Sequence, residues 1–164
     1  MQIQQVNDNV MGGISQSKIQ TLDDVVMGGQ STSSIITKDD TIMWSGHLKL
    51  VPYLQKIGFV SLQTTYVSPY KSGLQITVQS MLEPQSLILQ LVSTQKFRNG
   101  FQPATVIKVT RSVKTVFVNY SDFELFFRGN WLKRIEQINS SQIVGLNIIL
   151  TDGKPRKFKI KLQF

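Results

Sequence analysis

The chain has 164 residues, 18 of them basic and 10 acidic, which gives a formal net charge of +8, and it contains no cysteine. The missing cysteines exclude disulfide bonds, thiol catalysis and cysteine-ligated metal sites. No apolar run approaches the ~20 residues of a membrane-spanning helix, and the first residues lack the basic and apolar regions of a secretory signal. We therefore expect a cytoplasmic protein, without a transmembrane segment, whose length suits one domain with its own core.

Residues 8–35 contain one phrase twice, at a constant offset of 16 positions. Asp-Asn-Val-Met-Gly-Gly-Ile-Ser-Gln-Ser begins at Asp8, and Asp-Val-Val-Met-Gly-Gly-Gln-Ser-Thr-Ser begins at Asp24. Paired glycines permit positive φ angles, and an aspartate before them can accept hydrogen bonds from nearby backbone N–H groups. The alternating serines suit a short edge strand whose polar face is exposed to solvent. A phosphate-binding loop would need Lys-Ser or Lys-Thr after the glycines, so we interpret the phrase as a turn entering a strand.

Downstream of the repeat, apolar runs with alternating polar positions are separated by turn residues, which predicts strands with one buried face. Residues 131–142 could hold a short helix. The expected strands cover residues 42–50, 58–64, 74–79, 86–91, 105–111, 115–120, 143–150 and 157–164. The side chains expected to point inward include Trp44, Leu48, Leu50, Leu74, Ile76, Val78, Leu87, Leu89 and Leu91. About eight or nine short strands with hardly any helical pattern predict an all-β fold, an antiparallel β-sandwich or jelly roll.

The positive charge is concentrated in the second half of the chain, because residues 83–164 hold thirteen of the eighteen basic side chains. In the last strand Phe158, Ile160 and Leu162 alternate with lysines at 157, 159 and 161. Such lysines suit either a solvent-facing side or an edge guarded against pairing. An anionic partner is the alternative explanation of the charge. No aromatic-interleaved recognition motif accompanies it, so we expect no nucleic-acid partner.

Residues for catalysis or metal binding are few. His47 is the only histidine, and the sequence pairs it with no catalytic or ligating partner. The doublets at 23–24 and 39–40 could serve acid–base chemistry or bind Ca²⁺. The sequence contains no Gly-x-Ser-x-Gly elbow. We therefore predict a non-enzymatic protein with no catalytic residues and no cofactor or metal, with Ca²⁺ as a minor alternative.

The segment from Tyr120 to Trp131 contains five aromatic residues in twelve positions, as in core packing or a binding surface. We expect Phe123 and Phe127 to be buried, and Phe126 or Trp131 to remain at the surface. Arg128 could form a bidentate pair with Asp122. Tryptophan and arginine are favoured anchors of protein interfaces. The residues that we expect to contact a partner are Phe126, Arg128 and Trp131.

Four motifs in this order resemble the complex I intermediate-associated protein 30 family. They are Asp-Val-Val-Met-Gly-Gly-x-Ser-x-Ser at 24–33, Trp-x-Gly-x-Leu at 44–48, Gly-Phe-Val-Ser at 58–61, and Ser-Asp-Phe with Phe-Arg-Gly at 121–129. The sequence departs from the family pattern at residues 80–87. The motif positions that carry the resemblance are Asp24, Met27, Gly28, Gly29, Ser31, Ser33, Asp122, Phe123, Phe127 and Gly129.

The resemblance implies a galactose-binding-like jelly roll and a role as an assembly chaperone that binds respiratory-complex subunits or assembly intermediates. The second copy of the repeated phrase has the family's spacing to the Trp-x-Gly motif. We therefore assign residues 1–20 to an N-terminal arm that carries the duplicate motif, and residues 21–164 to the single jelly-roll domain.

A carbohydrate-binding jelly-roll module is the alternative function, because such folds often hold sugars against loop aromatics. The aromatic side chains that could stack on a sugar are Trp44, Tyr66, Tyr70 and Trp131. An oxidoreductase is disfavoured, since the sequence offers no recognisable catalytic set.

Overall fold

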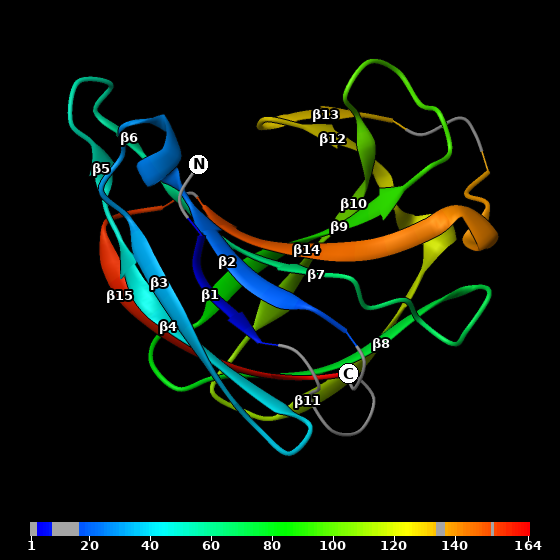
Figure 1. The fold of residues 1–164 in the computed structure, drawn as a ribbon, viewed down its shortest axis with the longest axis horizontal. Helices are drawn as coiled ribbons and strands as arrows, with labels where there is room; N and C mark the ends of the chain where they lie inside the picture. The colour runs from blue at the N-terminus through cyan, green and yellow to red at the C-terminus, as the bar shows by residue number, and fades with distance from the viewer. Residues whose placement is uncertain (1–2, 8–16, 134–136, 152) are drawn as a thin grey trace.

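The computed structural model describes residues 3–7, 17–133, 137–151 and 153–164, with side chains from residue 17 onward. In these residues two antiparallel sheets pack face to face (Figure 1). The large sheet has eight strands in the order β1-β2-β7-β14-β9-β10-β12-β13, and the small sheet has five in the order β11-β8-β15-β4-β3. The predicted antiparallel sandwich is confirmed. Among the described residues, no helix has the length and apolar character needed to cross a membrane.

The strands are short, and eight of them (β4, β7, β8, β9, β10, β11, β14 and β15) lie close to the eight predicted ranges. The large sheet contains β1 (Ile3–Asn7), β2 (Ile19–Asp23), β7 (Phe59–Thr64), β14 (Ile143–Thr151), β9 (Gln85–Ser93), β10 (Gln102–Val109), β12 (Glu124–Phe127) and β13 (Asn130–Leu132). The small sheet contains β11 (Lys114–Asn119), β8 (Gly73–Ser80), β15 (Arg156–Gln163), β4 (Thr41–Leu48) and β3 (Thr32–Lys38). A separate hairpin joins β5 (Leu50–Val51) to β6 (Lys56–Ile57), and the 3-10 turns are η2 (Asp24–Met27), η3 (Tyr120–Asp122) and η4 (Ser140–Gln142).

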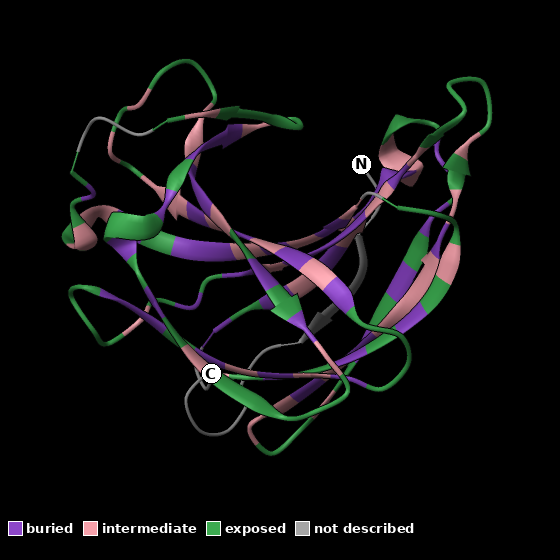
Figure 2. Cartoon of the chain, turned by 180° about the vertical axis from the view of Figure 1, so that it is seen from behind, coloured by how far each residue is buried: buried purple, intermediate pink, exposed green. Residues whose placement is uncertain are grey.

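The hydrophobic core lies between the two sheets, and buried residues alternate with more exposed ones along the strands (Figure 2). Trp44 of β4 packs edge-on against Phe158 of β15, with ring centroids 5.1 Å apart. The predicted inward series at 74–78, 87–91 and 158–162 are all buried in this core. Burying these aliphatic and aromatic side chains supplies the main favourable free energy of folding, at about 25 cal/mol per Å² of apolar surface.

The lysine-bearing strand β15 lies at the centre of the small sheet, paired with β4 on one side and β8 on the other. A central strand has no open edge to protect, so edge protection does not explain the lysines. Lys157, Lys159 and Lys161 are exposed on the sheet face turned away from the core. Of the two explanations, the solvent-facing side is therefore correct.

Three local expectations are wrong. Leu50 does not share the buried face of Trp44, because the chain leaves β4 after Leu48 and Leu50 is exposed in the β5–β6 hairpin. Residues 131–142 begin as strand β13, and their described 3-10 turn is only the three-residue η4. The serines of the second repeat copy, Ser31 and Ser33, lie on a buried face instead of a solvent-exposed one.

The first copy of the repeat is described only in part, because residues 8–16 lie outside the described residues. Strands β1 and β2 occupy equivalent positions of the two copies, and they pair with each other at the edge of the large sheet. Ile19 of β2 is fully buried in the core, so a boundary at residue 20 falls inside a core strand. The assignment of residues 1–20 to an arm stays a prediction.

Candidate functional site

The second copy of the repeated phrase forms a buried polar network. Asp23, at the end of β2, accepts hydrogen bonds from the backbone N–H and the hydroxyl of Ser33 at 2.6 and 2.8 Å. It also accepts one from the backbone N–H of Ser61 at 3.4 Å. Burial raises the pKa of Asp23 to about 6, although the bonds from Ser33 and Ser61 oppose this shift. The carboxyl therefore joins strands β2 and β7 of the large sheet to β3 of the small sheet.

Asp24 forms the second half of this network. Its carboxylate accepts hydrogen bonds from the backbone N–H groups of Ser31, at 2.8 Å, and Phe59, at 3.1 Å. Gly29 and Gly58 lie directly against it, and a Cβ atom at either glycine would overlap the carboxylate. The glycines of two separate motifs are thus needed so that the backbone can approach Asp24 closely.

The hydrogen bonds of this network bear on whether it could hold a metal ion. The carboxylate oxygens of Asp23 and Asp24 are occupied by N–H and O–H donors, which leaves them poorly suited to a Ca²⁺ ion that requires many oxygen ligands. Among the described residues, no group of three or more histidine, aspartate or glutamate side chains is placed to hold a metal. His47 lies on the outer face of the small sheet, opposite Thr32 and Lys157.

The β12–β13 hairpin carries the three residues predicted to contact a partner. Its two-residue turn is Arg128-Gly129, with φ angles of 47° and 84°, as in the type I′ turns of tight hairpins. Arg128 lies over the ring of Phe127, 5.1 Å from its centroid. In the described structure Arg128 therefore stacks on an aromatic ring and forms no ion pair with Asp122.

Trp131 and Phe126 face each other across this hairpin, with ring centroids 4.6 Å apart. Phe126 is only 5% exposed, whereas Trp131 is 39% exposed. Of the two side chains proposed to reach the surface, only Trp131 does so. The predicted burial of Phe123 is correct, and Phe127 is partly buried.

The four aromatic residues proposed for sugar stacking do not form one surface. Trp44 is 0% exposed and Tyr66 is buried, so neither ring can stack on a ligand. Tyr70 is exposed, but it packs edge-on against Phe117 of the small sheet. Only Trp131 of the four is exposed at the large sheet.

The outer face of the large sheet, defined as the face turned away from the small sheet, carries a row of amide side chains. Cross-strand register aligns Gln20 with Gln63, Gln63 with Asn147, and Asn147 with Gln90. Gln20 donates a 2.8 Å hydrogen bond to Gln63, and Gln90 donates a 3.2 Å bond to the carbonyl of Phe126. Sequence reasoning overlooked this row, although glutamine or asparagine recurs at outward positions of its strands.

An aliphatic row lies next to the amides. Register places Ile149 of β14 opposite Ile88 of β9, and Ile88 opposite Val106 of β10. These side chains are half-buried or exposed. Figure 1 shows the β12–β13 hairpin at one side of this face, and η2 with the β5–β6 hairpin at the other. The two central rows therefore offer an uncharged surface, and the charged side chains of Glu124 and Lys108 lie beside them on β12 and β10.

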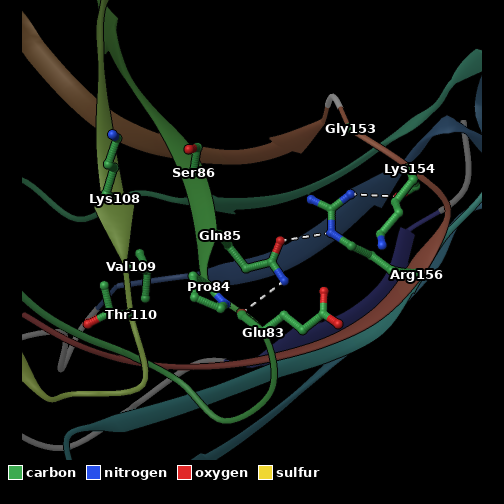
Figure 3. Close-up of a pocket in the computed structure, with 10 residues that line it drawn as sticks. All are labelled: Glu83, Pro84, Gln85, Ser86, Lys108, Val109, Thr110, Gly153, Lys154 and Arg156. Carbon is green, nitrogen blue, oxygen red and sulfur yellow. Dashed lines mark hydrogen bonds between the residues drawn. The ribbon is translucent and has the colours of Figure 1, made fainter.

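A separate pocket of about 350 Å³ lies where β9 begins and β10 ends, beside the turn between β14 and β15 (Figure 3). Arg156 donates hydrogen bonds to the side chain of Gln85 at 2.9 Å and to the carbonyl of Lys154 at 2.7 Å. The lining residues are Glu83, Pro84, Gln85, Ser86, Lys108, Val109, Thr110, Gly153, Lys154 and Arg156.

The architecture defines the class of protein, an antiparallel β-sandwich of the jelly-roll type. A family 11 carbohydrate-binding module from Clostridium thermocellum, in complex with a β-1,3-1,4-mixed-linked tetrasaccharide, matches with a TM-score of 0.59 and 12% identity, over 96% of this chain and 94% of that one. The family 11 module of the cellulosomal cellulase Lic26A-Cel5E, from the same organism, matches with a TM-score of 0.55 and 13% identity, over 97% and 93%. At these identities the likeness establishes the fold alone.

The particular family follows from the sequence pattern. The family Complex I intermediate-associated protein 30 matches residues 17–162, nearly the whole chain, so the chain belongs to this family. A comparison with curated proteins finds no match. The resemblance inferred from the motifs is confirmed, and the Asp-Val-Val-Met-Gly-Gly motif that carries much of it forms the buried network of Asp23 and Asp24.

The contacts of Asp24 predict a non-additive pair of substitutions. Asp24→Ala should lower the free energy of unfolding by about 2–4 kcal/mol, because two buried N–H groups lose their acceptor. Gly58→Ala should also destabilise the chain, because the added methyl group overlaps the carboxylate. In the double variant the methyl group occupies vacated space, so the combined loss should be clearly smaller than the sum. Denaturant titrations of the three variants measure these losses. Strictly additive losses would contradict the close contact between Gly58 and the Asp24 carboxylate.

The raised pKa of Asp23 predicts a pH-dependent stability. The folded chain binds this proton more tightly than the unfolded chain, because the pKa rises from 3.8 to about 6 on folding. The stabilising contribution of the carboxyl is therefore complete below the unfolded pKa and is lost as the pH rises through the folded one. We expect the difference in free energy of unfolding between wild type and Asp23→Asn to fall by up to roughly 3 kcal/mol between pH 4 and pH 7. A constant difference across this range, in denaturant titrations, would show that the carboxyl does not titrate there.

Proposed function

We propose that this chain is a non-enzymatic binding module that assists assembly by engaging a protein partner on the outer face of the large sheet, beside Trp131. Membership of the family named for association with complex I intermediates supports this role. The partner that fits it best is a respiratory-complex subunit or assembly intermediate.

The observation that carries the proposal is the exposed Trp131 on a sheet face whose central amide and aliphatic rows are uncharged. The centres of protein interfaces are depleted of charged residues, and tryptophan is enriched among the side chains that dominate their binding energy. Phe126 packs against the indole ring as its cross-strand neighbour, with ring centroids 4.6 Å apart. The exposed Arg128 at the hairpin turn is held over Phe127 and can reach a partner from the same hairpin. We propose that Trp131 and Arg128 make contact, and that Phe126 orients Trp131.

The placement of the ionisable groups supports binding over catalysis. His47 lies on the small sheet, and Asp23 and Asp24 are committed to the interior network. None of them lies on the outer face of the large sheet. The central rows of the binding face are built from aliphatic side chains, which have no acid–base chemistry, and from amides, which are very weak acids and bases.

Binding of a carbohydrate on this same face is the second candidate. Four aligned amides can donate and accept hydrogen bonds with sugar hydroxyl groups, and an exposed indole can stack on a sugar ring. Two of the solved structures with a similar fold are family 11 carbohydrate-binding modules, one of them in complex with a tetrasaccharide. The residues for this candidate are the amide row and Trp131.

The protein-partner proposal is tested by affinity capture from the native cell with wild type and Trp131→Ala. Loss of an interface tryptophan typically weakens binding by about 30-fold or more, so respiratory-complex subunits should be recovered with wild type and largely lost with the variant. Phe117→Ala is the matched control, because Phe117 is a 42% exposed aromatic side chain on the small sheet. Equal recovery with Trp131→Ala, or recovery of no such subunit, would contradict the proposal.

The carbohydrate candidate is tested by titrating a β-1,3-1,4-linked tetrasaccharide while following tryptophan fluorescence. Trp44 is fully buried, so a saturable change on sugar binding should come from Trp131. We expect Trp131→Phe to remove the fluorescence change, while calorimetry still detects weakened binding. Lack of a saturable signal in wild type by both methods would remove this sugar from consideration.

A further inference from the structure

We propose that the pocket between the start of β9, the end of β10 and the β14–β15 turn binds a small ligand with an oxyanion group, a phosphate or a carboxylate. This site lies apart from the β12–β13 hairpin and is independent of the function proposed above. Its volume of about 350 Å³ is at the lower end of the range typical of small-molecule sites.

The charges around the pocket favour an anion. Among the described residues that line it, Lys108, Lys154 and Arg156 are cationic and Glu83 carries the one carboxylate. A hollow lined mainly by one sign of charge focuses the electrostatic field and raises the local concentration of counter-ions. The three cationic side chains come from two distant parts of the chain, β10 and the segment from the β14–β15 turn to the first residue of β15, and the fold brings them to one place.

Arg156 is held in a fixed orientation at this site. Its Nε donates to Oε1 of Gln85, and one terminal nitrogen donates to the carbonyl of Lys154. Gln85 is itself only 5% exposed, and its amide group donates a 3.1 Å hydrogen bond to the carbonyl of Glu83. A guanidinium group anchored in this way loses little conformational entropy when an anion arrives.

The remaining groups shape what the pocket can hold. Figure 3 shows Arg156 and Lys154 at one side, Lys108 and Ser86 at the other, and Glu83 below. Lys108 and Ser86 are cross-strand neighbours on the outer face of the large sheet, so the pocket opens at the margin of that face. The hydroxyls of Ser86 and Thr110 can donate to an oxyanion, and the Glu83 carboxylate can accept from a hydroxyl or amine of the same ligand.

The test follows the backbone amide signals of the whole chain in NMR titrations with inorganic phosphate and, separately, with acetate, at constant ionic strength set by chloride. We expect saturable shifts at residues 108–110 and 153–156 with one or both probes. The probe that binds more tightly identifies phosphate or carboxylate as the preferred group. The double variant Lys108→Ala/Lys154→Ala should weaken binding by about tenfold or more, because charge-assisted hydrogen bonds are lost.

The matched control is Lys159→Ala/Lys161→Ala, which removes the same charge from the exposed face of the small sheet. Its affinity should stay within about twofold of wild type, because these lysines follow Arg156 by three and five residues along an extended strand, about 10 Å or more, and exposed charges beyond a Debye length of roughly 10 Å are largely screened. All four lysines are exposed, and unchanged amide signals in the core verify that each variant is folded. Absence of saturable shifts at the pocket, or equal weakening in both double variants, would overturn the proposal.

Discussion

The structure depends on two adjacent carboxyl groups buried at the point where the chain passes from one sheet to the other. Asp23 bonds to Ser33 and Ser61, and Asp24 bonds to Ser31 and Phe59, so backbone groups of both sheets converge on one dipeptide. Burying a carboxylate costs much free energy of folding unless hydrogen-bond donors surround it. The donors here are mostly backbone N–H groups, whose positions are fixed by the sheets, so the network can form only when β2, β3 and β7 are correctly placed.

This constraint explains why widely separated motifs accompany one another in the sequence. Asp24 requires Gly29 five residues later, and it also requires Gly58 in the segment that leads into β7, because a side chain at either position would overlap the carboxylate. The serines of the motif close the same unit: Ser31 accepts a 2.9 Å hydrogen bond from the N–H of Lys49 and Ser33 binds Asp23. The motif that identifies the family therefore joins the two sheets, and its polar side chains Asp24, Ser31 and Ser33 are occupied by hydrogen bonds within the protein.

Much of the fold could be predicted from the sequence, because alternation of apolar and polar residues determines which face of a strand is buried. Leu74, Leu89 and Ile160 occupy the core for this reason. The order of strands within each sheet could not be predicted from this alternation. β15 was equally compatible with an edge or a centre, since both positions leave one face in solvent.

The candidate site was less predictable, because exposure of an aromatic ring depends on its neighbours in space. Trp44 and Trp131 look alike in sequence, yet one packs on Phe158 in the core and the other covers Phe126 at the surface. Arg128 could have been placed with more success, since Arg-Gly between two short strands is compatible with a tight hairpin turn. The amide row required the pairing of four strands that are far apart in sequence.

The positions of the lysines in the fold divide them into two groups that the composition cannot tell apart: those on the flat face of the small sheet and those around the pocket. Lys157, Lys159 and Lys161 stand on a central strand beside polar or uncharged cross-strand neighbours, and solvation is enough to explain them. Lys108 and Lys154 line a hollow in which a buried glutamine fixes an arginine. Exposed lysines on a flat face are each solvated separately and do not act together on one anion. Cations around a concave site add their electrostatic fields, so that each strengthens the attraction for the same anion. Of these lysines, only the two at the pocket therefore favour a ligand, because the fold there forms a hollow that an anion could fill.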